Sequence, residues 1–206
     1  GIARICDESG VDPKKINRVM HGTTVATNAV LQGKGSVVGL VTTAGYEHTL
    51  QVARSFCPGG LGGWVSFNKK PLLAPLELTI GAQERMGAKG DVVRELDEAK
   101  LREDLTALKA KGGIEALTIC FINAHINGDN EVKAKAIAQE IFTDIHISIS
   151  SEVVPEMQEY ERTETTVVNS YIRPIVSKYI ESLESELNQR MNGVQLHILR
   201  SDGGLA

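Results

Sequence analysis

Cysteine is scarce in this sequence and metal-binding patterns are missing. Cys6, Cys57 and Cys120 are odd in number and widely spaced, which suits a reducing cytosol better than a disulfide framework. Neither CxxC nor HxxxH occurs and the five histidines are scattered, so we expect no metal ligands in this chain. Cys57 could be a nucleophile, but no histidine or aspartate lies near it, and a bystander thiol is the simpler interpretation.

Long apolar runs and a surplus of positive charge are also lacking. No run approaches the roughly 18 residues of a membrane span, and no signal segment is recognisable. The formal net charge is −4, whereas nucleic acid or an anionic membrane would favour a basic face. Both partners are therefore unexpected, and a cytoplasmic protein is favoured. The 206 residues, 42% of them hydrophobic, suffice for one large domain or two small ones.

The chain is organised around a strand that turns directly into a helix. Residues 16–20 alternate apolar and polar side chains, and residues 25–30 carry apolar ones at helical spacing. Between them, Gly22 supplies a permissive backbone, and the hydroxyl of Thr23 or Thr24 can cap the first helical turn. Such a helix start is a potential anion site, although an ordinary capped turn is the simpler interpretation of these residues taken alone.

Two strand–helix–strand units are predicted. The mostly apolar residues 36–43 complete the first, after the strand at 16–20 and its helix. The second unit comprises strand 114–123, a helix from about 130 to 142, and strand 145–149.

His125 follows the carboxyl end of the strand at 114–123. In open α/β sheets this is the edge where ligands bind, so His125 is a site candidate. His146 is expected within a strand and is interpreted as structural.

Other segments connect these units. Residues 46–56 predict a short helix, and residues 57–64 predict an irregular glycine-rich loop, either a mobile one or a plain linker. Residues 76–80 and 92–96 predict a hairpin around the turn at 87–91. Asp97 then caps a helix that reaches about residue 111, with Leu101, Leu105 and Leu108 on one face.

The last third of the sequence predicts a long amphipathic helix and a strand. Apolar residues follow three- and four-residue steps from Val167 to Leu187, and Pro174 should kink this helix. Near its start, Arg162 belongs either to a solvated helix end or to a site. The strand at 194–199 leads into an Asp-Gly-Gly turn at residues 202–204, which allows close backbone approach to a ligand.

The two ends of the sequence suggest a piece of a longer protein. The chain starts at Gly1, inside what reads as an amphipathic helix, and stops on a Gly-Gly turn with nothing returning from it.

Three segments carry a resemblance to a known family. Residues 21–29 (HGTTVATNA), residues 159–169 (EYERTETTVVN) and residues 201–204 (SDGG) resemble signatures of the ATP-dependent hydantoinase/oxoprolinase A family, in matching order. Residues 58–64 and the ending at 200–204 look closest to the acetophenone-carboxylase and caprolactamase branch.

The resemblance implies an α/β fold in which βαβ units with mixed sheets form part of an acetate-kinase/sugar-kinase/Hsp70/actin-like fold, with a long kinked C-terminal helix. It also implies that ATP, normally with Mg²⁺, phosphorylates a carbonyl oxygen of the substrate. The family's Asp-Gly-Gly-Thr phosphate hairpins are absent from this sequence. We therefore expect ATP and Mg²⁺ in the full-length enzyme only, and no activity from this piece alone.

The site residues expected from the motifs fall into two groups. The first, taken as catalytic, comprises Thr23, Thr24 and His125. The second, taken as binding substrate or phosphate, comprises His21, Gly22, Asn28, Arg162, Asp202, Gly203 and Gly204.

Three functions stay open. The leading one is part of an ATP-dependent hydrolase of cyclic amides (hydantoin, 5-oxoproline or a lactam). The second is a subunit of an ATP-dependent ketone carboxylase, and the third is a non-catalytic assembly module. The expected partners are a companion B-type subunit or domain, a small cyclic amide or ketone, and a second copy of the chain.

The expected division of the chain is into three parts. Residues 1–75 form a partial N-terminal βαβ lobe, residues 76–150 a hairpin plus βαβ subdomain, and residues 151–206 the long helix and strand that begin the next lobe.

Overall fold

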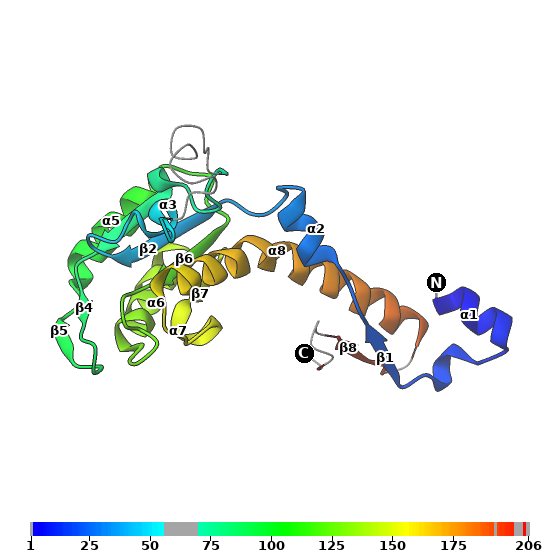
Figure 1. The fold of residues 1–206 in the computed structure, drawn as a ribbon. Coiled ribbons are helices and arrows are strands. Elements are labelled where there is room, and N and C mark those ends of the chain that lie inside the picture. Colours follow the sequence, from blue (N-terminus) through cyan, green and yellow to red (C-terminus); the bar gives the residue numbers. More distant parts are fainter. Residues whose placement is uncertain (1, 56–69, 192, 200–203, 205–206) are drawn as a thin grey trace, which may run out of the picture. The chain divides into compact units, whose positions relative to one another are not determined.

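The computed structural model describes residues 2–55, 70–191, 193–199 and 204. The chain forms two compact units (Figure 1). The central unit comprises Gly35–Pro174, and the terminal unit combines Gly1–Lys34 with Ile175–Ala206. The predicted loop with Cys57 and Trp64 lies outside the described residues, as do Asp202 and Gly203.

A four-stranded parallel sheet forms the middle of the central unit (Figure 1). Its order is β3 (Thr79–Ala82), β2 (Val38–Thr43), β6 (Ala116–Cys120), β7 (His146–Ile149). In register, Leu40 of β2 lies opposite Thr79, and Val38 lies opposite Ala116. Every residue of β2 and β6 is buried, as expected of inner strands that are covered on both faces.

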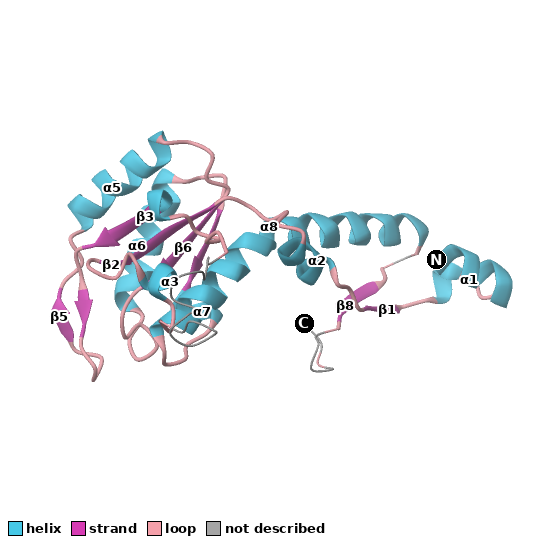
Figure 2. Cartoon of the chain, turned by 45° about the horizontal axis from the view of Figure 1, so that its top comes forward, coloured by secondary structure: helices cyan, strands magenta, loops and turns pink. Residues whose placement is uncertain are grey.

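Helices cover the two faces of this sheet (Figure 2). On one face, α5 (Glu98–Ala110) and α6 (Asp129–Ile141) pack against Leu117 and Ile119 of β6. On the other face, α3 (Thr49–Val52) and the first half of α8 (Glu159–Arg190) pack against Leu40 of β2. The α/β class is therefore confirmed, and so is the unit β6–α6–β7. The helix predicted at 46–56 is shorter in the structure than expected, since α3 spans four residues.

The antiparallel hairpin differs from the prediction. It joins β4 (Arg85–Met86) to β5 (Val92–Arg94) through the predicted turn, and it projects from the sheet in Figures 1 and 2. The expected partner at 76–80 is wrong, since Leu76–Leu78 is a 3-10 helix and β3 joins the parallel sheet. The alternation of apolar and polar residues in this short segment is compatible with an antiparallel hairpin and with a parallel sheet. In the structure Ile80 packs against the core cluster that includes Val41 of β2. The predicted mixed sheet is also wrong, because this sheet is wholly parallel.

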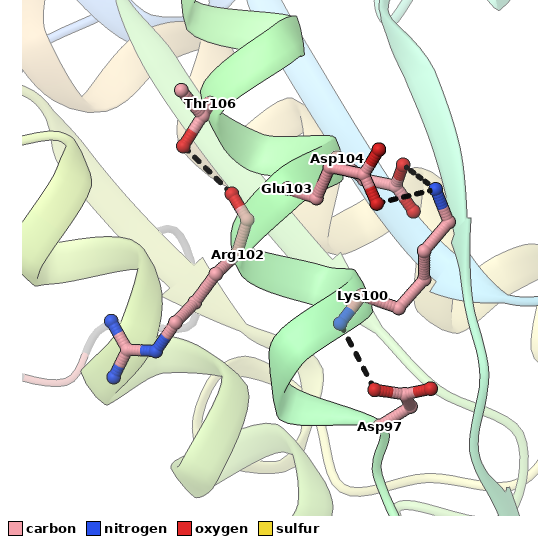
Figure 3. A network of polar contacts seen from close by, with 6 residues as sticks. All are labelled: Asp97, Lys100, Arg102, Glu103, Asp104 and Thr106. Atoms are coloured by element: carbon pink, nitrogen blue, oxygen red, sulfur yellow. Dashed lines mark hydrogen bonds and ion pairs between the residues drawn. The ribbon is translucent and has the colours of Figure 1, made fainter.

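Helix α5 begins as predicted. The Asp97 carboxylate accepts a hydrogen bond from the Lys100 backbone N–H at 2.9 Å (Figure 3), which satisfies one free donor of the first turn. The Lys100 ammonium forms ion pairs with Glu103 at 3.2 Å and Asp104 at 2.9 Å on the outer face. The inner face buries three leucines: Leu101, Leu105 and Leu108.

The first half of α8 packs against the sheet through polar side chains. The Thr118 hydroxyl on β6 donates to Ser170 Oγ at 2.7 Å, and the Asn169 amide donates to Ser148 Oγ on β7 at 3.0 Å. Ser170 is fully buried. These short side chains let the helix approach closely, and their hydrogen bonds offset the cost of burying polar groups.

Helix α8 is one continuous helix of 32 residues with Pro174 inside it. The kink expected at Pro174 stays a prediction. Among the described residues, no helix is both long and apolar enough to cross a membrane.

The terminal unit contains the beginning of the chain and the strand after α8. Its elements are α1 (Ile2–Ser9), the 3-10 helix Pro13–Lys15, β1 (Arg18–His21), α2 (Val25–Leu31), the second half of α8 and β8 (Gln195–Ile198). β1 pairs with β8 in parallel, with His21 opposite Ile198.

The first predicted βαβ unit is therefore wrong, because β1 and β2 belong to different sheets. The two compact units also differ from the expected boundaries after residues 75 and 150. Both boundaries fall within the central unit, since β2 pairs with β3 and β6, and β6 pairs with β7.

Candidate active site

The carboxyl edge of the parallel sheet gathers several buried polar side chains. Thr43 ends β2, Glu84 follows β3 and Ser150 follows β7. Each is at most 2% exposed. Buried polar groups are tolerated when they are hydrogen-bonded, and the partners of these groups define how the edge is built.

Glu84 joins β2, β3 and α6. One carboxylate oxygen accepts from the Thr43 hydroxyl, and the other accepts from Asn130 Nδ2 at 2.9 Å. The Thr43 oxygen in turn accepts from the Ile122 backbone N–H at 3.0 Å. The pKa of Glu84 is raised because burial disfavours the charged carboxylate, although both hydrogen bonds oppose the shift. Asn130 Oδ1 is buried without a partner.

Glu131 joins the ends of β6 and β7. Its carboxylate accepts from the backbone N–H groups of Phe121 and Ser151, both at 2.8 Å, and from the Ser150 hydroxyl at 2.6 Å. Glu131 is completely buried. Three donors on one carboxylate fix the loops that follow the two strands.

Arg162 lies beside this cluster and is 1% exposed. Its guanidinium donates to Ser150 Oγ at 3.2 Å, to the Phe121 carbonyl at 2.8 Å and to the Glu156 carbonyl at 3.0 Å. It is therefore not part of a solvated helix end. In this structure Arg162 holds α8 to the loops after β6 and β7.

His125 is the half-buried member of the group. Its Nδ1 lies 3.3 Å from Arg162 Nη1. A guanidinium can only donate, so Nδ1 accepts, and the proton of the neutral ring lies on Nε2. His125 thus offers an N–H donor at the carboxyl edge. The prediction that His125 follows the end of a buried strand is confirmed, since β6 ends at Cys120.

The predicted turn at 22–24 lies in the terminal unit, where Thr23 and Thr24 are exposed. The Val25 backbone N–H donates to Thr23 Oγ1 at 3.2 Å, so a threonine hydroxyl caps the helix start as expected. Thr24 occupies the N-cap position without a capping bond, and its hydroxyl accepts from the Asn28 amide at 3.3 Å. The helix that follows has only seven residues.

His21 ends β1 in the same unit. Its Nε2 lies 2.8 Å from the Tyr179 hydroxyl of α8, and the two rings are 5.8 Å apart between centroids. This contact anchors β1 to the second half of α8. Of the Asp-Gly-Gly ending, only Gly204 is described, and it is half-buried.

The structure thus brings Arg162 and His125 together. The members of the turn and His21 form a second group in the terminal unit. Sequence reasoning missed Glu84, Asn130, Glu131 and Ser150. A usable signal was available for Glu84, because it follows a strand of a parallel sheet, but this strand was assigned to the hairpin.

Metal ligands were not expected, and the described residues contain no group of three acidic, histidine or cysteine side chains able to hold a metal. The carboxylate oxygens of Glu84 and Glu131 already accept hydrogen bonds from N–H and O–H groups of the protein. These two carboxylates therefore do not fit the role of Mg²⁺ ligands. Cys6 and Cys120 are buried free thiols. Burial raises the pKa of Cys120, which makes it a poor nucleophile.

The fold and this edge define an α/β protein whose parallel sheet carries a polar cluster at its carboxyl end. Residues 1–142 match the hydantoinase/oxoprolinase N-terminal region, and residues 162–206 match the hydantoinase/oxoprolinase domain. The chain belongs to the hydantoinase/oxoprolinase family.

Its relatives are much longer proteins. The chain is 30% identical over 210 residues to caprolactamase subunit alpha of Pseudomonas jessenii, covering 100% of this chain and 30% of that protein. It is 28% identical over 209 residues to the acetophenone carboxylase gamma subunit of Aromatoleum aromaticum, covering 93% and 28%. The crystal structure of the ATP-dependent caprolactamase from Pseudomonas jessenii superposes with a TM-score of 0.87 at 30% identity, over 100% of this chain and 30% of that one. The chain therefore spans about 30% of the length of these relatives.

Proposed function

We propose that this chain is part of an ATP-dependent enzyme that hydrolyses a cyclic amide. The overall reaction is one lactam, one ATP and two waters giving the ring-opened amino acid, ADP and phosphate. The observation that carries the proposal is His125, held by buried Arg162 at the carboxyl edge of the sheet. Likeness to a caprolactamase subunit along the entire chain supports the choice of substrate.

ATP with Mg²⁺ would supply a phosphoryl group to the amide oxygen, which makes the carbonyl carbon electrophilic enough for water to add and for the ring C–N bond to break; a second water then releases the phosphate. The nucleotide site belongs to the longer protein in this proposal, together with an acetate-kinase/sugar-kinase/Hsp70/actin-like fold. The piece described here is inactive alone.

His125 acts as a hydrogen-bond donor in this proposal. A neutral imidazole with its proton on Nε2 can donate to the substrate carbonyl oxygen, the atom that becomes phosphorylated. Arg162 acts as a positioning residue, because the guanidinium on Nδ1 fixes the tautomer. An N–H donor aimed at developing negative charge stabilises the transition state.

The remaining motif residues are proposed to contact phosphate or substrate oxygens. They are His21, Gly22, Thr23, Thr24, Asn28, Asp202, Gly203 and Gly204. We further propose a companion B-type subunit, since two relatives are named as subunits, and a cytoplasmic location.

A ketone carboxylase is the second candidate, favoured by the similarity to the acetophenone carboxylase gamma subunit. In that case the same carbonyl activation would precede carboxylation of an enol phosphate. A non-catalytic assembly module is the third.

One assay separates these functions. The complete protein that carries this chain, with its companion subunit, is incubated with ATP, Mg²⁺ and a candidate substrate, and ADP and the organic product are quantified. ADP formation that requires ε-caprolactam, 5-oxoproline or hydantoin, with ring-opened product, supports the hydrolase. A requirement for a ketone plus bicarbonate supports the carboxylase instead. Absence of turnover with either class contradicts both and favours the assembly module.

Two variants test the role of His125. His125→Ala is expected to lower kcat by about 100-fold or more, whereas His125→Gln, which keeps an N–H near the Nε2 position, should retain a larger share of the activity. Equal losses in both variants would contradict the donor role and point to a general base.

A further inference from the structure

A pocket of about 370 Å³ lies in the central unit where α3 and the start of α8 meet. It follows the carboxyl end of β2, on the edge where open α/β sheets bind ligands. The side chains that matter for recognition are Tyr46, His48, Glu159 and Tyr160. None of them belongs to the buried cluster of Glu84, Glu131 and Arg162.

Among the residues that line the pocket, Glu159 carries the negative charge. Among the described residues, no cation pairs with the Glu159 carboxylate. Burial is the main cause that raises the pKa of Tyr160, with the charges of Glu164 and Glu161 adding to it.

Two arginines lie near residues of the pocket wall. Arg54 is paired with Glu161 and donates to Gln158 at 2.8 Å. Arg85 lies 5.2 Å from the centroid of the Tyr46 ring. The Arg54 guanidinium is thus held by Glu161, and the Tyr46 contact shows that this ring already attracts a cation on one face.

Two residues next to the pocket adopt an unfavourable backbone. Ala53, in the pocket wall, has φ 51°, and Gln158, directly before Glu159, has φ 80°. Non-glycine residues rarely adopt positive φ, and such strain is concentrated at binding and catalytic sites.

We propose that this pocket binds a small organic cation, specifically a primary ammonium on a short apolar chain. The ammonium pairs with Glu159 and lies against a tyrosine ring, while the chain contacts Val52 and Ala53. The pocket volume lies at the lower end of the range for small-molecule sites. This inference does not depend on the reaction that the protein catalyses.

The test uses n-butylammonium as the probe and n-butanol as its neutral counterpart, at constant ionic strength. Binding to the complete chain is followed by backbone amide shifts in heteronuclear NMR spectra. We expect saturable shifts at Gly45, Tyr46, Ala53 and Tyr160 with n-butylammonium and at least about fivefold weaker binding of n-butanol.

Three variants locate the interaction. Glu159→Gln should weaken n-butylammonium binding at least about fivefold, whereas Glu156→Gln, an exposed carboxylate in the segment before α8, should leave it unchanged. Tyr46→Leu keeps the apolar bulk and should weaken the cation selectively. Equal binding of the two probes, an unaffected Glu159→Gln variant, or no saturable shift in the millimolar range would each overturn the proposal.

Discussion

At the scale of single residues, the buried carboxyl of Glu84 predicts how stability depends on pH. Because its pKa is raised from 4.5 in the folded chain, the native state binds a proton that the unfolded chain releases. The contribution to the free energy of unfolding is therefore complete below the unfolded pKa and is lost as pH rises through the folded pKa. Glu84→Gln should remove this pH dependence, because glutamine has no ionisable carboxyl group. The fold should tolerate the change, because the Asn130 amide can turn so that its unpartnered Oδ1 accepts from the new amide.

The measurement is urea unfolding at a series of pH values, with Glu77→Gln as the matched control, because Glu77 is exposed. A slope that survives in Glu84→Gln and disappears in Glu77→Gln would contradict the assignment.

Gly35 is a second residue with a clear stability prediction. A Cβ at this position would lie 2.0 Å from the ring of Tyr171, which is 7% exposed. Gly35→Ala should lower the free energy of unfolding by roughly 1–3 kcal/mol, because the packed ring has to move. Gly22→Ala, where a Cβ meets nothing within 4 Å, serves as the control in the same thermal unfolding measurement. Equal effects of the two substitutions would show that crowding at Tyr171 is not the cause.

Thr23 carries the prediction for the exposed turn of the terminal unit. Thr23→Ala in the full-length enzyme should reduce turnover by about an order of magnitude or more, through loss of a positioned hydroxyl. Thr23→Ser keeps the hydroxyl that accepts from Val25 and should restore most of the rate. Steady-state kinetics check this, and unchanged turnover in Thr23→Ala would remove Thr23 from the site.

At the scale of elements, the cap of α5 can be tested in isolation. Asp97→Ala removes the acceptor of the Lys100 N–H and should cost about 1 kcal/mol of stability, whereas Asp97→Asn should cost little, since asparagine caps equally well. Urea unfolding monitored by circular dichroism gives both values. A loss in Asp97→Asn as large as in Asp97→Ala would mean that charge, not capping, stabilises this helix end.

The sequence was most informative about helices. Asp97 and the leucines at positions 101, 105 and 108 specify α5 through interactions within one segment, and the same holds for the apolar spacing of α8. Strand partners were harder to predict, because pairing is chosen among segments far apart in the chain. The alternating residues 76–80 could have joined a hairpin, and nothing local to Arg18 indicates that β1 pairs with β8.

The candidate site was predicted only in part for the same reason. His125 was found because it follows a recognisable buried strand. The contact between His125 and Arg162 depends on packing α8 against the sheet, which no local pattern encodes. Glu131 reads as an ordinary first-turn acid, and only its burial among Phe121, Ser150 and Ser151 shows its role.

At the scale of the whole molecule, the two units should differ in local stability. β2 and β6 are buried along their full length, whereas β1 alternates exposed and half-buried residues and has β8 as its sheet partner. Two-stranded sheets are marginal in water, so the amides of β2 and β6 should exchange at least about 100-fold more slowly than those of β1 and β8. Hydrogen exchange measured by mass spectrometry checks this, and equal protection would mean that both units open together.

The position of β2 in the sheet also has a consequence during synthesis on the ribosome. Leu40 pairs with Thr79, 39 positions later, and Val38 pairs with Ala116, 78 positions later. At typical elongation rates the second partner arrives roughly 4–16 s after β2 itself. Until then, a strand that is covered on both faces in the folded chain lacks at least one of its two neighbouring strands. We therefore expect the yield of folded chain to depend on elongation speed and on chaperones that shield the nascent segment.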